Sequence, residues 1–126
     1  MLADDCSINP DFCQYNRVFF AYCDGNSFAS NLAEPLPVPN ALDRHTGKPI
    51  TPPPLIYFRG KQNMETILNT LVAKHGLGDA VNVLETGASA GGLAAYLHAD
   101  SVHQFLLQAA PKMKRYKSGV AILPPT

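Results

Sequence analysis

The chain has 126 residues, with 10 basic and 10 acidic side chains that leave no net charge. This length allows at most one small domain, residues 1–126. The charge balance gives no basic stripe for nucleic acid, and no apolar run reaches the roughly 18 residues of a membrane span. Residues 1–5 lack the basic and apolar stretches of a leader peptide. We therefore expect no nucleic-acid partner and no membrane span.

The cysteines and histidines give no metal pattern. Cys6, Cys13 and Cys23 have spacings that match no zinc site, and no pair of histidines complements them. We therefore expect no metal and no cofactor. An odd number of cysteines leaves one with a partner elsewhere, or all three as buried free thiols, because cysteine often serves as a small buried hydrophobic residue. The sequence leaves both alternatives open, and with them the disulfide pairing.

The first predicted element is a strand at residues 16–23, whose nearly continuous apolar run is typical of a strand buried on both faces of an α/β sheet. Residues 34–54 contain most of the chain's 11 prolines, which predicts an extended surface loop or insertion without regular structure. A ligand for a proline-recognition domain is the less favoured alternative. Residues 55–59 form a second predicted strand, which Gly60 ends.

The next apolar residues recur at the spacing of one helix face: Met64, Ile67, Leu68, Leu71 and Val72. Lys74, His75 and Gly76 are signals for the end of this helix. Residues 81–85 are short and rich in β-branched and apolar side chains, which predicts a third strand.

The last part of the chain predicts two more helical stretches and a strand. The helical stretches lie at residues 92–97 and between a cap at Asp100 and the stop at Pro111. Residues 112–117 form a predicted basic loop, and residues 119–123 a fourth strand. The order strand, strand, helix, strand, helix, strand predicts an α/β fold, with a parallel sheet and crossover helices.

Residues 87–92, Gly-Ala-Ser-Ala-Gly-Gly, lie between the third predicted strand and a helix. A serine flanked by small residues at such a turn is typical of the nucleophile elbow of α/β-hydrolases. The turn is so tight that we expect only glycine to fit at Gly87 and Gly91. It exposes Ser89 as a nucleophile above a helix N-terminus, where the Ala90 N–H can stabilise an oxyanion. The elbow glycines are Gly87, Gly91 and Gly92.

Two other interpretations of this segment stay open. One is an ordinary glycine-rich turn without chemistry. The other is an anion-binding loop, because glycine-rich turns before helices also hold phosphate. The segment lacks the Lys and Ser or Thr that end a P-loop, and its glycines do not fit Gly-x-Gly-x-x-Gly. The strand and helix on either side favour the nucleophile.

A serine nucleophile needs a base, and in this fold an acid and then a histidine follow it in the chain. The candidates after Ser89 are His98, Asp100 and His103, all on the predicted helical region that leads away from it. At about 1.5 Å per residue, the two histidines lie roughly 13 and 21 Å along that region, beyond the ~3 Å reach of a hydrogen bond. The chain therefore holds a nucleophile and half an oxyanion hole without the acid and base.

Five segments form a more specific pattern than the elbow alone. They are Asn-Pro-Asp-Phe at residues 9–12, Asn-Arg-Val at 16–18, Tyr-Cys-Asp-Gly-Asn-Ser-Phe at 22–28, Tyr-Phe-Arg-Gly at 57–60 and Gly-Ala-Ser-Ala-Gly-Gly-Leu at 87–93. Together they resemble the pectin acetylesterase family, which includes the Notum-type lipid esterases. Segment 22–28 is more similar to the plant pectin enzymes than to the Notum branch.

The resemblance implies an α/β-hydrolase-like fold and a secreted or cell-wall protein. It implies a carboxylic ester hydrolase that removes acetyl groups from an acetylated polysaccharide, pectin, through an acyl-enzyme on Ser89. Ala90 corresponds to an oxyanion-hole residue of the family. Asp24 and Gly25 match a stretch that lies near the pocket in such proteins.

The chain departs from the family pattern at several points. The family's Gly-rich oxyanion segment belongs upstream of the first shared motif, and its catalytic Asp and His belong downstream of residue 126. Ala88 and Ala99 stand where the family commonly has cysteines. We therefore interpret the chain as a fragment of such an esterase, inactive on its own. The alternatives are a non-catalytic α/β module that binds carbohydrate or an acyl ligand, and an unstable product without function.

Overall fold

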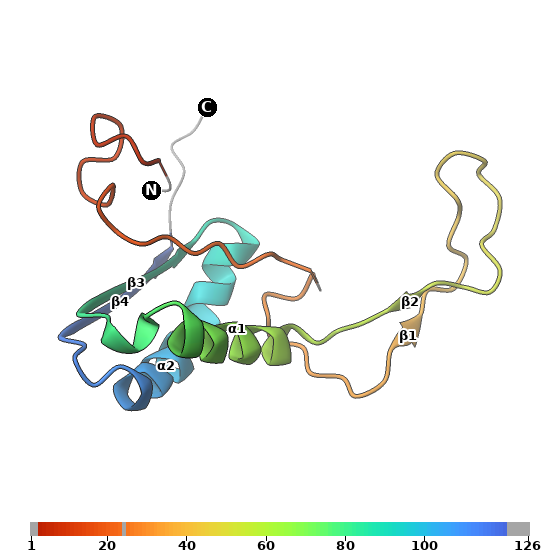
Figure 1. Cartoon of the computed structure of the whole chain (residues 1–126). Helices are drawn as coiled ribbons and strands as arrows, with labels where there is room; N and C mark the ends of the chain where they lie inside the picture. Colours follow the sequence, from red (N-terminus) through yellow and green to blue (C-terminus); the bar gives the residue numbers. More distant parts are fainter. Residues whose placement is uncertain (1–2, 24, 121–126) are drawn as a thin grey trace.

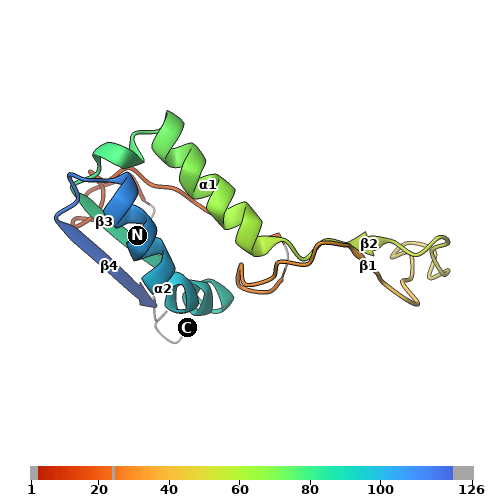
Figure 2. The ribbon, with the colours of Figure 1, turned by 90° about the horizontal axis from the view of Figure 1, so that it is seen from below.

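The structure is a computed structural model that describes residues 3–23 and 25–120. A small body contains helices α1 (Gly60–Lys74) and α2 (Ala90–Ala109), strands β3 (Asn82–Gly87) and β4 (Arg115–Val120), and a short 3₁₀ helix η1 (Leu77–Asp79). A narrow arm carries strands β1 (Leu36–Pro37) and β2 (Leu55–Ile56). The arm projects away from the body in both views (Figures 1 and 2).

The body is built around a β3–α2–β4 unit. β3 and β4 pair in parallel, from Asn82 opposite Arg115 to Gly87 opposite Val120. Parallel neighbours need a crossover connection, and α2 supplies it by packing on both strands. The predicted α/β class and a crossover helix on a parallel sheet are thus confirmed.

The core lies where α2 meets α1. Met64 and Leu68 of α1 pack with Val102 and Leu106 of α2 in one cluster, and Leu106 is only 1 % exposed. Figure 2 shows α2 between the β3–β4 sheet and α1. Because α2 has apolar partners on both sides, it is the central element that fixes where the β3–α2 turn lies.

Helix α1 confirms the predicted amphipathic helix and its end. Its last residue is Lys74, and the His75 N–H donates to the Leu71 carbonyl. Gly76 then takes a φ of +75°, in the left-handed region that glycine enters without steric cost. Glycine at this position therefore turns the chain from α1 into η1.

The strand predicted at residues 16–23 is wrong: this segment forms no strand in the described part of the chain. A strand is stabilised by backbone hydrogen bonds to a neighbour, and the β3–β4 sheet does not include this segment. Two of its apolar side chains consequently face solvent, Val18 being 51 % and Phe19 78 % exposed, whereas Phe20 is partly buried against the core. An apolar run favours an extended backbone, but a strand also needs a neighbouring strand, which this segment lacks among the described residues.

The strand predicted at residues 55–59 is shorter than expected and does not belong to the parallel sheet. Only Leu55 and Ile56 form β2, which pairs antiparallel with β1 instead of joining the parallel sheet. The proline-rich segment 34–54 thereby folds back on itself, with a further bridge between Leu42 and Pro49. The expectation of no regular structure at residues 34–54 is therefore wrong at β1 and at this bridge. Proline cannot donate to a ladder of backbone hydrogen bonds. The pairs that form are accordingly short.

The two helical stretches predicted after the elbow form one continuous helix, α2, so Asp100 lies inside it and caps nothing. No glycine or proline occurs between residues 93 and 109 to interrupt the helix. The predicted basic loop, residues 112–117, holds only for residues 112–114, because β4 begins at Arg115. In β4, exposed Arg115 and Lys117 alternate with inward Tyr116 and Ser118, as the period of a strand requires. Residues 121–123 of the predicted fourth strand lie outside the described residues.

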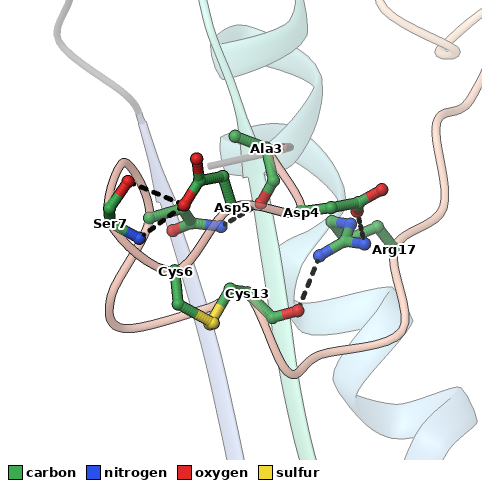
Figure 3. Close-up of a disulfide and its surroundings, with 8 residues drawn as sticks. Ala3, Asp4, Asp5, Cys6, Ser7, Cys13 and Arg17 are labelled. Atoms are coloured by element: carbon green, nitrogen blue, oxygen red, sulfur yellow. Dashed lines mark hydrogen bonds and ion pairs between the residues drawn. A yellow bond between two sulfur atoms is a disulfide. The ribbon is translucent and has the colours of Figure 1, made fainter.

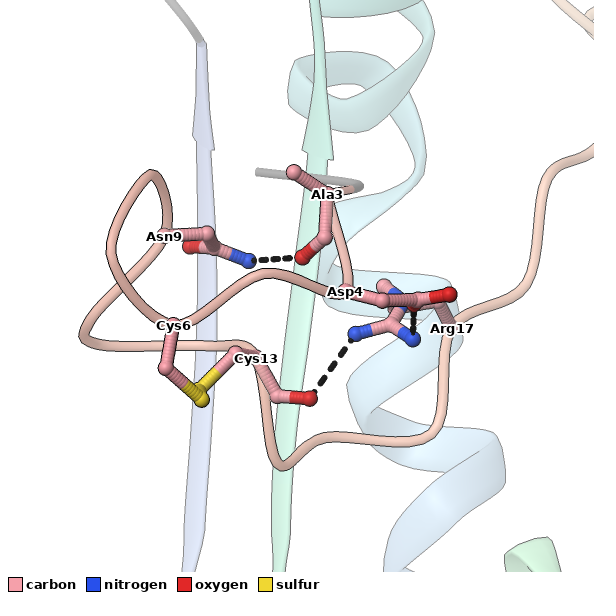
Figure 4. Close-up of polar contacts among 6 residues, drawn as sticks. All are labelled: Ala3, Asp4, Cys6, Asn9, Cys13 and Arg17. Carbon is pink, nitrogen blue, oxygen red and sulfur yellow. Dashed lines mark hydrogen bonds and ion pairs between the residues drawn. A yellow bond between two sulfur atoms is a disulfide. The ribbon is translucent and has the colours of Figure 1, made fainter.

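The N-terminal segment is a loop closed by a Cys6–Cys13 disulfide, with an S–S distance of 2.02 Å (Figure 3). Cys23 is free and exposed, so the alternative of three buried free thiols is wrong for this structure, and a partner for Cys23 elsewhere stays a prediction. Arg17 donates to the Cys13 carbonyl and pairs with Asp4 across the loop (Figure 4). The Asn9 amide donates to the Ala3 carbonyl at 2.9 Å. Among the described residues, no helix has the length and apolar character needed to cross a membrane.

Candidate active site

The β3–α2 turn holds Ser89 in a strained conformation. β3 ends at Gly87 and α2 begins at Ala90, so two residues make the whole turn. Ser89 has a φ of +53° and a ψ of −124°, in a region that costs a non-glycine residue about 1–3 kcal/mol. Its side chain is exposed and makes no capping hydrogen bond to α2. A strained, exposed serine at this turn has the geometry that the elbow interpretation requires.

Gly87 is the glycine that the turn requires. A Cβ at this position would lie 2.1 Å from the Gly91 carbonyl oxygen and 2.2 Å from its carbonyl carbon. Both are backbone atoms that cannot move aside, so any larger residue would force β3 away from α2. Gly91 differs from the expectation, because a Cβ there would meet nothing within 4 Å. Gly92 is buried in the first turn of α2.

The first turn of α2 places backbone donors beside Ser89. The Gly91 N–H donates to the Ala88 carbonyl at 2.9 Å, and the Leu93 N–H to the Ser89 carbonyl at 3.1 Å. The Ala90 N–H belongs to the first turn, whose donors have no acceptor inside the helix. Together with the partial positive charge of a helix N-terminus, this makes Ala90 a suitable donor for a developing anion.

The two histidines after Ser89 have other partners. The His98 Nε2 lies 2.9 Å from the Ser27 carbonyl, and the His103 ring stacks on Tyr116 with centroids 4.9 Å apart. Asp100 is exposed on α2. The structure therefore does not bring the three candidates together around Ser89.

Sequence reasoning did not predict a polar cluster that joins β3, β4 and α2. The Tyr116 hydroxyl of β4 donates to the Glu85 carboxylate of β3 and lies 3.0 Å from the Ala99 carbonyl of α2. Burial raises the pKa of Glu85, although the Tyr116 hydrogen bond opposes that effect. Burial, and then the neighbouring Glu85 carboxylate, raises the pKa of Tyr116. The signal in the sequence is an acidic residue within an apolar strand.

A family model described as pectinacetylesterase matches residues 1–120. The chain belongs to the pectinacetylesterase family. It is 35% identical to pectin acetylesterase 7 of Arabidopsis thaliana over 104 residues. These residues are 82% of this chain and 22% of that relative. It is 36% identical over 104 residues to pectin acetylesterase 11 of the same plant, with the same shares covered.

A more distant relative comes from an animal. The palmitoleoyl-protein carboxylesterase NOTUM of Schmidtea mediterranea is 26% identical over 115 residues, covering 91% of this chain and 18% of that protein. The chain thus spans about a fifth of the length of the curated relatives that it matches. No solved structure matches it.

The pocket residues implied by the family resemblance are only partly described. Asp24 lies outside the described residues. Gly25 is exposed with a φ of +68°, and a Cβ there would meet nothing within 4 Å. A groove of about 400 Å³ opens between α1 and α2, lined in part by Met64 and His98, but Ser89 does not line it. In the part of the chain that the structure describes, no three His, Cys, Asp or Glu side chains gather as a metal site would require.

Proposed function

We propose that this chain carries the nucleophile of a pectin acetylesterase, a carboxylic ester hydrolase that removes acetyl groups from acetylated pectin. The observation that carries the proposal is the positive φ of Ser89 at the β3–α2 turn, in a member of the pectinacetylesterase family. An ordinary glycine-rich turn has no need to hold a serine in a strained conformation, because glycine would adopt it without cost.

The mechanism is acyl transfer in two steps. The Ser89 hydroxyl oxygen attacks the carbonyl carbon of the acetyl ester while a base removes its proton. The Ala90 N–H donates to the oxyanion of the tetrahedral intermediate. The sugar hydroxyl leaves with a proton and an acetyl-serine remains. Water then attacks this acetyl-serine, releases acetate and restores the Ser89 hydroxyl.

The acid and base of this mechanism come from outside the 126 residues in our proposal. His98 and His103 are engaged by Ser27 and Tyr116, and the chain spans about a fifth of the relatives that it matches. An Asp–His pair and a second oxyanion donor would complete the site in a larger α/β-hydrolase-like fold. Without a base, we expect the 126-residue chain to retain only residual turnover. A secreted or cell-wall protein fits the pectin substrate.

The test uses the protein at the length that its gene encodes, assayed with p-nitrophenyl acetate and with acetylated pectin. Ser89→Ala should abolish acetate release from both substrates. Ser101→Ala is the matched control, because it also removes an exposed serine hydroxyl, one that lies on α2 and donates to the His98 carbonyl. Full turnover by Ser89→Ala would refute the proposed nucleophile. A third outcome would favour the binding alternative. If the wild type released no acetate and Ser89→Ala bound acetylated pectin as the wild type does, the protein would be a non-catalytic binding module instead of an esterase.

A further inference from the structure

Ser27 links a loop far away in sequence to the first residue of α2. Its hydroxyl donates to the Ala90 carbonyl at 3.1 Å, across 63 residues of chain. Its own carbonyl lies 2.9 Å from the His98 Nε2, two turns further along the same helix. Ser27 is 5 % exposed and both bonds are partly buried, where a hydrogen bond is electrostatically stronger than at the surface. One residue therefore holds the N-terminal part of α2 at two points.

The loop that carries Ser27 has a strained backbone at Ser27 and Phe28. Ser27 has a φ of +50° and Phe28 a φ of +57°, and neither is a glycine. Such conformations persist only where the surroundings hold them. The Ser27 N–H donates to the Tyr22 hydroxyl at 3.0 Å, and the Phe28 ring is buried against Phe20 and Tyr22. The loop is thus fixed from its own side, and Ser27 transmits that fixed position to α2.

Ala90, the first residue of α2, is the residue that matters for the proposed chemistry, because its N–H and its carbonyl lie in the two peptide groups that meet at its Cα. The Ala90 carbonyl and the Ala90 N–H belong to one residue, and that N–H lies next to Ser89 in the chain. Anchoring the carbonyl limits rotation of the residue that must aim its N–H at an oxyanion. A donor in an oxyanion hole contributes only when its position is set before the reaction.

We propose that Ser27 is a positioning residue, which orients the Ala90 N–H and the Ser89 turn through its hydroxyl bond to the Ala90 carbonyl, with His98 anchoring the other side of Ser27. This inference rests on the proposed function, in which Ser89 is the nucleophile and Ala90 the oxyanion donor. Ser27 touches neither substrate nor the reacting atoms. Its contribution is the precision with which the turn is held.

The decisive variant is Ser27→Gly. Glycine accepts the positive φ at residue 27 without steric cost, so this change removes the hydroxyl while leaving the loop free to keep its conformation. Ser118→Ala is the matched control, because the Ser118 hydroxyl also donates to an α2 carbonyl, that of Ala95, at 3.0 Å. Both variants lose one serine-to-helix bond of similar length, but only Ser27→Gly loses it in the first turn.

Amide hydrogen exchange gives a readout that does not need the enzyme to be active. We expect Ser27→Gly to speed exchange about tenfold at the Gly91 and Leu93 amides, which bond Ala88 and Ser89 across the turn. Exchange at the buried Leu106 amide should stay as in the wild type. Ser118→Ala should leave the Gly91 and Leu93 amides unchanged. Wild-type exchange at both amides in Ser27→Gly would overturn the inference.

Kinetics on the protein at the length that its gene encodes complete the test. Ser27→Gly should lower kcat about tenfold with KM within twofold of the wild type, because a misaligned oxyanion donor weakens binding of the transition state and spares the ground state. An unchanged kcat, or equal losses in Ser27→Gly and Ser118→Ala, would overturn the positioning role. If Ser89→Ala retains turnover, the proposed function fails and the positioning role with it. If Ser89→Ala is inactive and Ser27→Gly fully active, only the present inference fails.

Discussion

Gly87 and Gly91 approach so closely that a Cβ on Gly87 would lie 2.1 Å from the Gly91 carbonyl oxygen. The contact joins the last residue of β3 to the first turn of α2, and it fixes the angle between them. The two residues are not equivalent, because a Cβ on Gly91 would point into open space. Of these two glycines, only Gly87 is sterically required by the elbow.

This asymmetry gives the first prediction. Gly87→Ala should lower the free energy of unfolding by several kcal/mol or prevent folding, because the methyl group overlaps backbone atoms that cannot yield. Gly91→Ala should be neutral or stabilising by up to about 1 kcal/mol, because alanine suits a helix better than glycine. Urea denaturation of both variants measures the difference. Equal stabilities would show that the turn is not as tight as described.

The second prediction concerns the pH dependence of stability. Because burial raises the pKa of Glu85 above its ordinary value of 4.5, the folded state binds its proton more tightly than the unfolded state does. The contribution of Glu85 is fully present below pH 4.5 and is lost as the pH rises through the raised pKa. Glu85→Gln should therefore remove a fall in stability over that interval, measured as the urea midpoint against pH.

The control for this experiment is Glu65→Gln, which changes an exposed side chain on α1. Asp5, Asp43 and Asp79 have lowered pKa values from hydrogen bonds to neighbouring groups, so their contributions are lost as the pH falls. These three contributions are the same in Glu85→Gln and Glu65→Gln, so they cancel when the two stability profiles are compared. A Glu85→Gln profile parallel to the wild type would contradict the assignment.

The third prediction concerns the disulfide. Cys6 and Cys13 close a loop with a sequence separation of 7. Restricting so short a loop in the unfolded chain stabilises the folded state by about 2–3 kcal/mol in the chain-entropy account. Replacing both residues with serine should lower the urea midpoint accordingly. Cys23→Ser should leave it unchanged, since Cys23 is free and exposed; a loss there as large as that of the double variant would contradict this pairing.

The sequence predicted the elements whose signals are local. Helix α1, strand β3 and the turn at Ser89 depend on periodicity, on β-branched residues and on small residues near each other in the chain. The wrong predictions concern elements that need a partner segment from elsewhere in the chain. Residues 16–23 have the composition of a buried strand, but a strand forms only where a neighbour accepts its hydrogen bonds, and composition does not name that neighbour.

Other parts of the site arise from contacts between distant segments. The bond from Ser27 to Ala90 crosses 63 residues, and that from Tyr116 to Glu85 crosses 31. Neither partner carries a local signal that points to the other. The small residues around Ser89 predict a tight turn that exposes its side chain. The positive φ of Ser89, a non-glycine residue, could not be predicted from the sequence.

The central claim is that Ser89 is the nucleophile. The most direct measurement treats the protein, at the length that its gene encodes, with a fluorophosphonate that labels activated serines, followed by peptide mapping by mass spectrometry. We expect one labelled peptide, carrying the adduct on Ser89, and no labelling of Ser89→Ala. An adduct on another serine, or equal labelling of wild type and Ser89→Ala, would contradict the account.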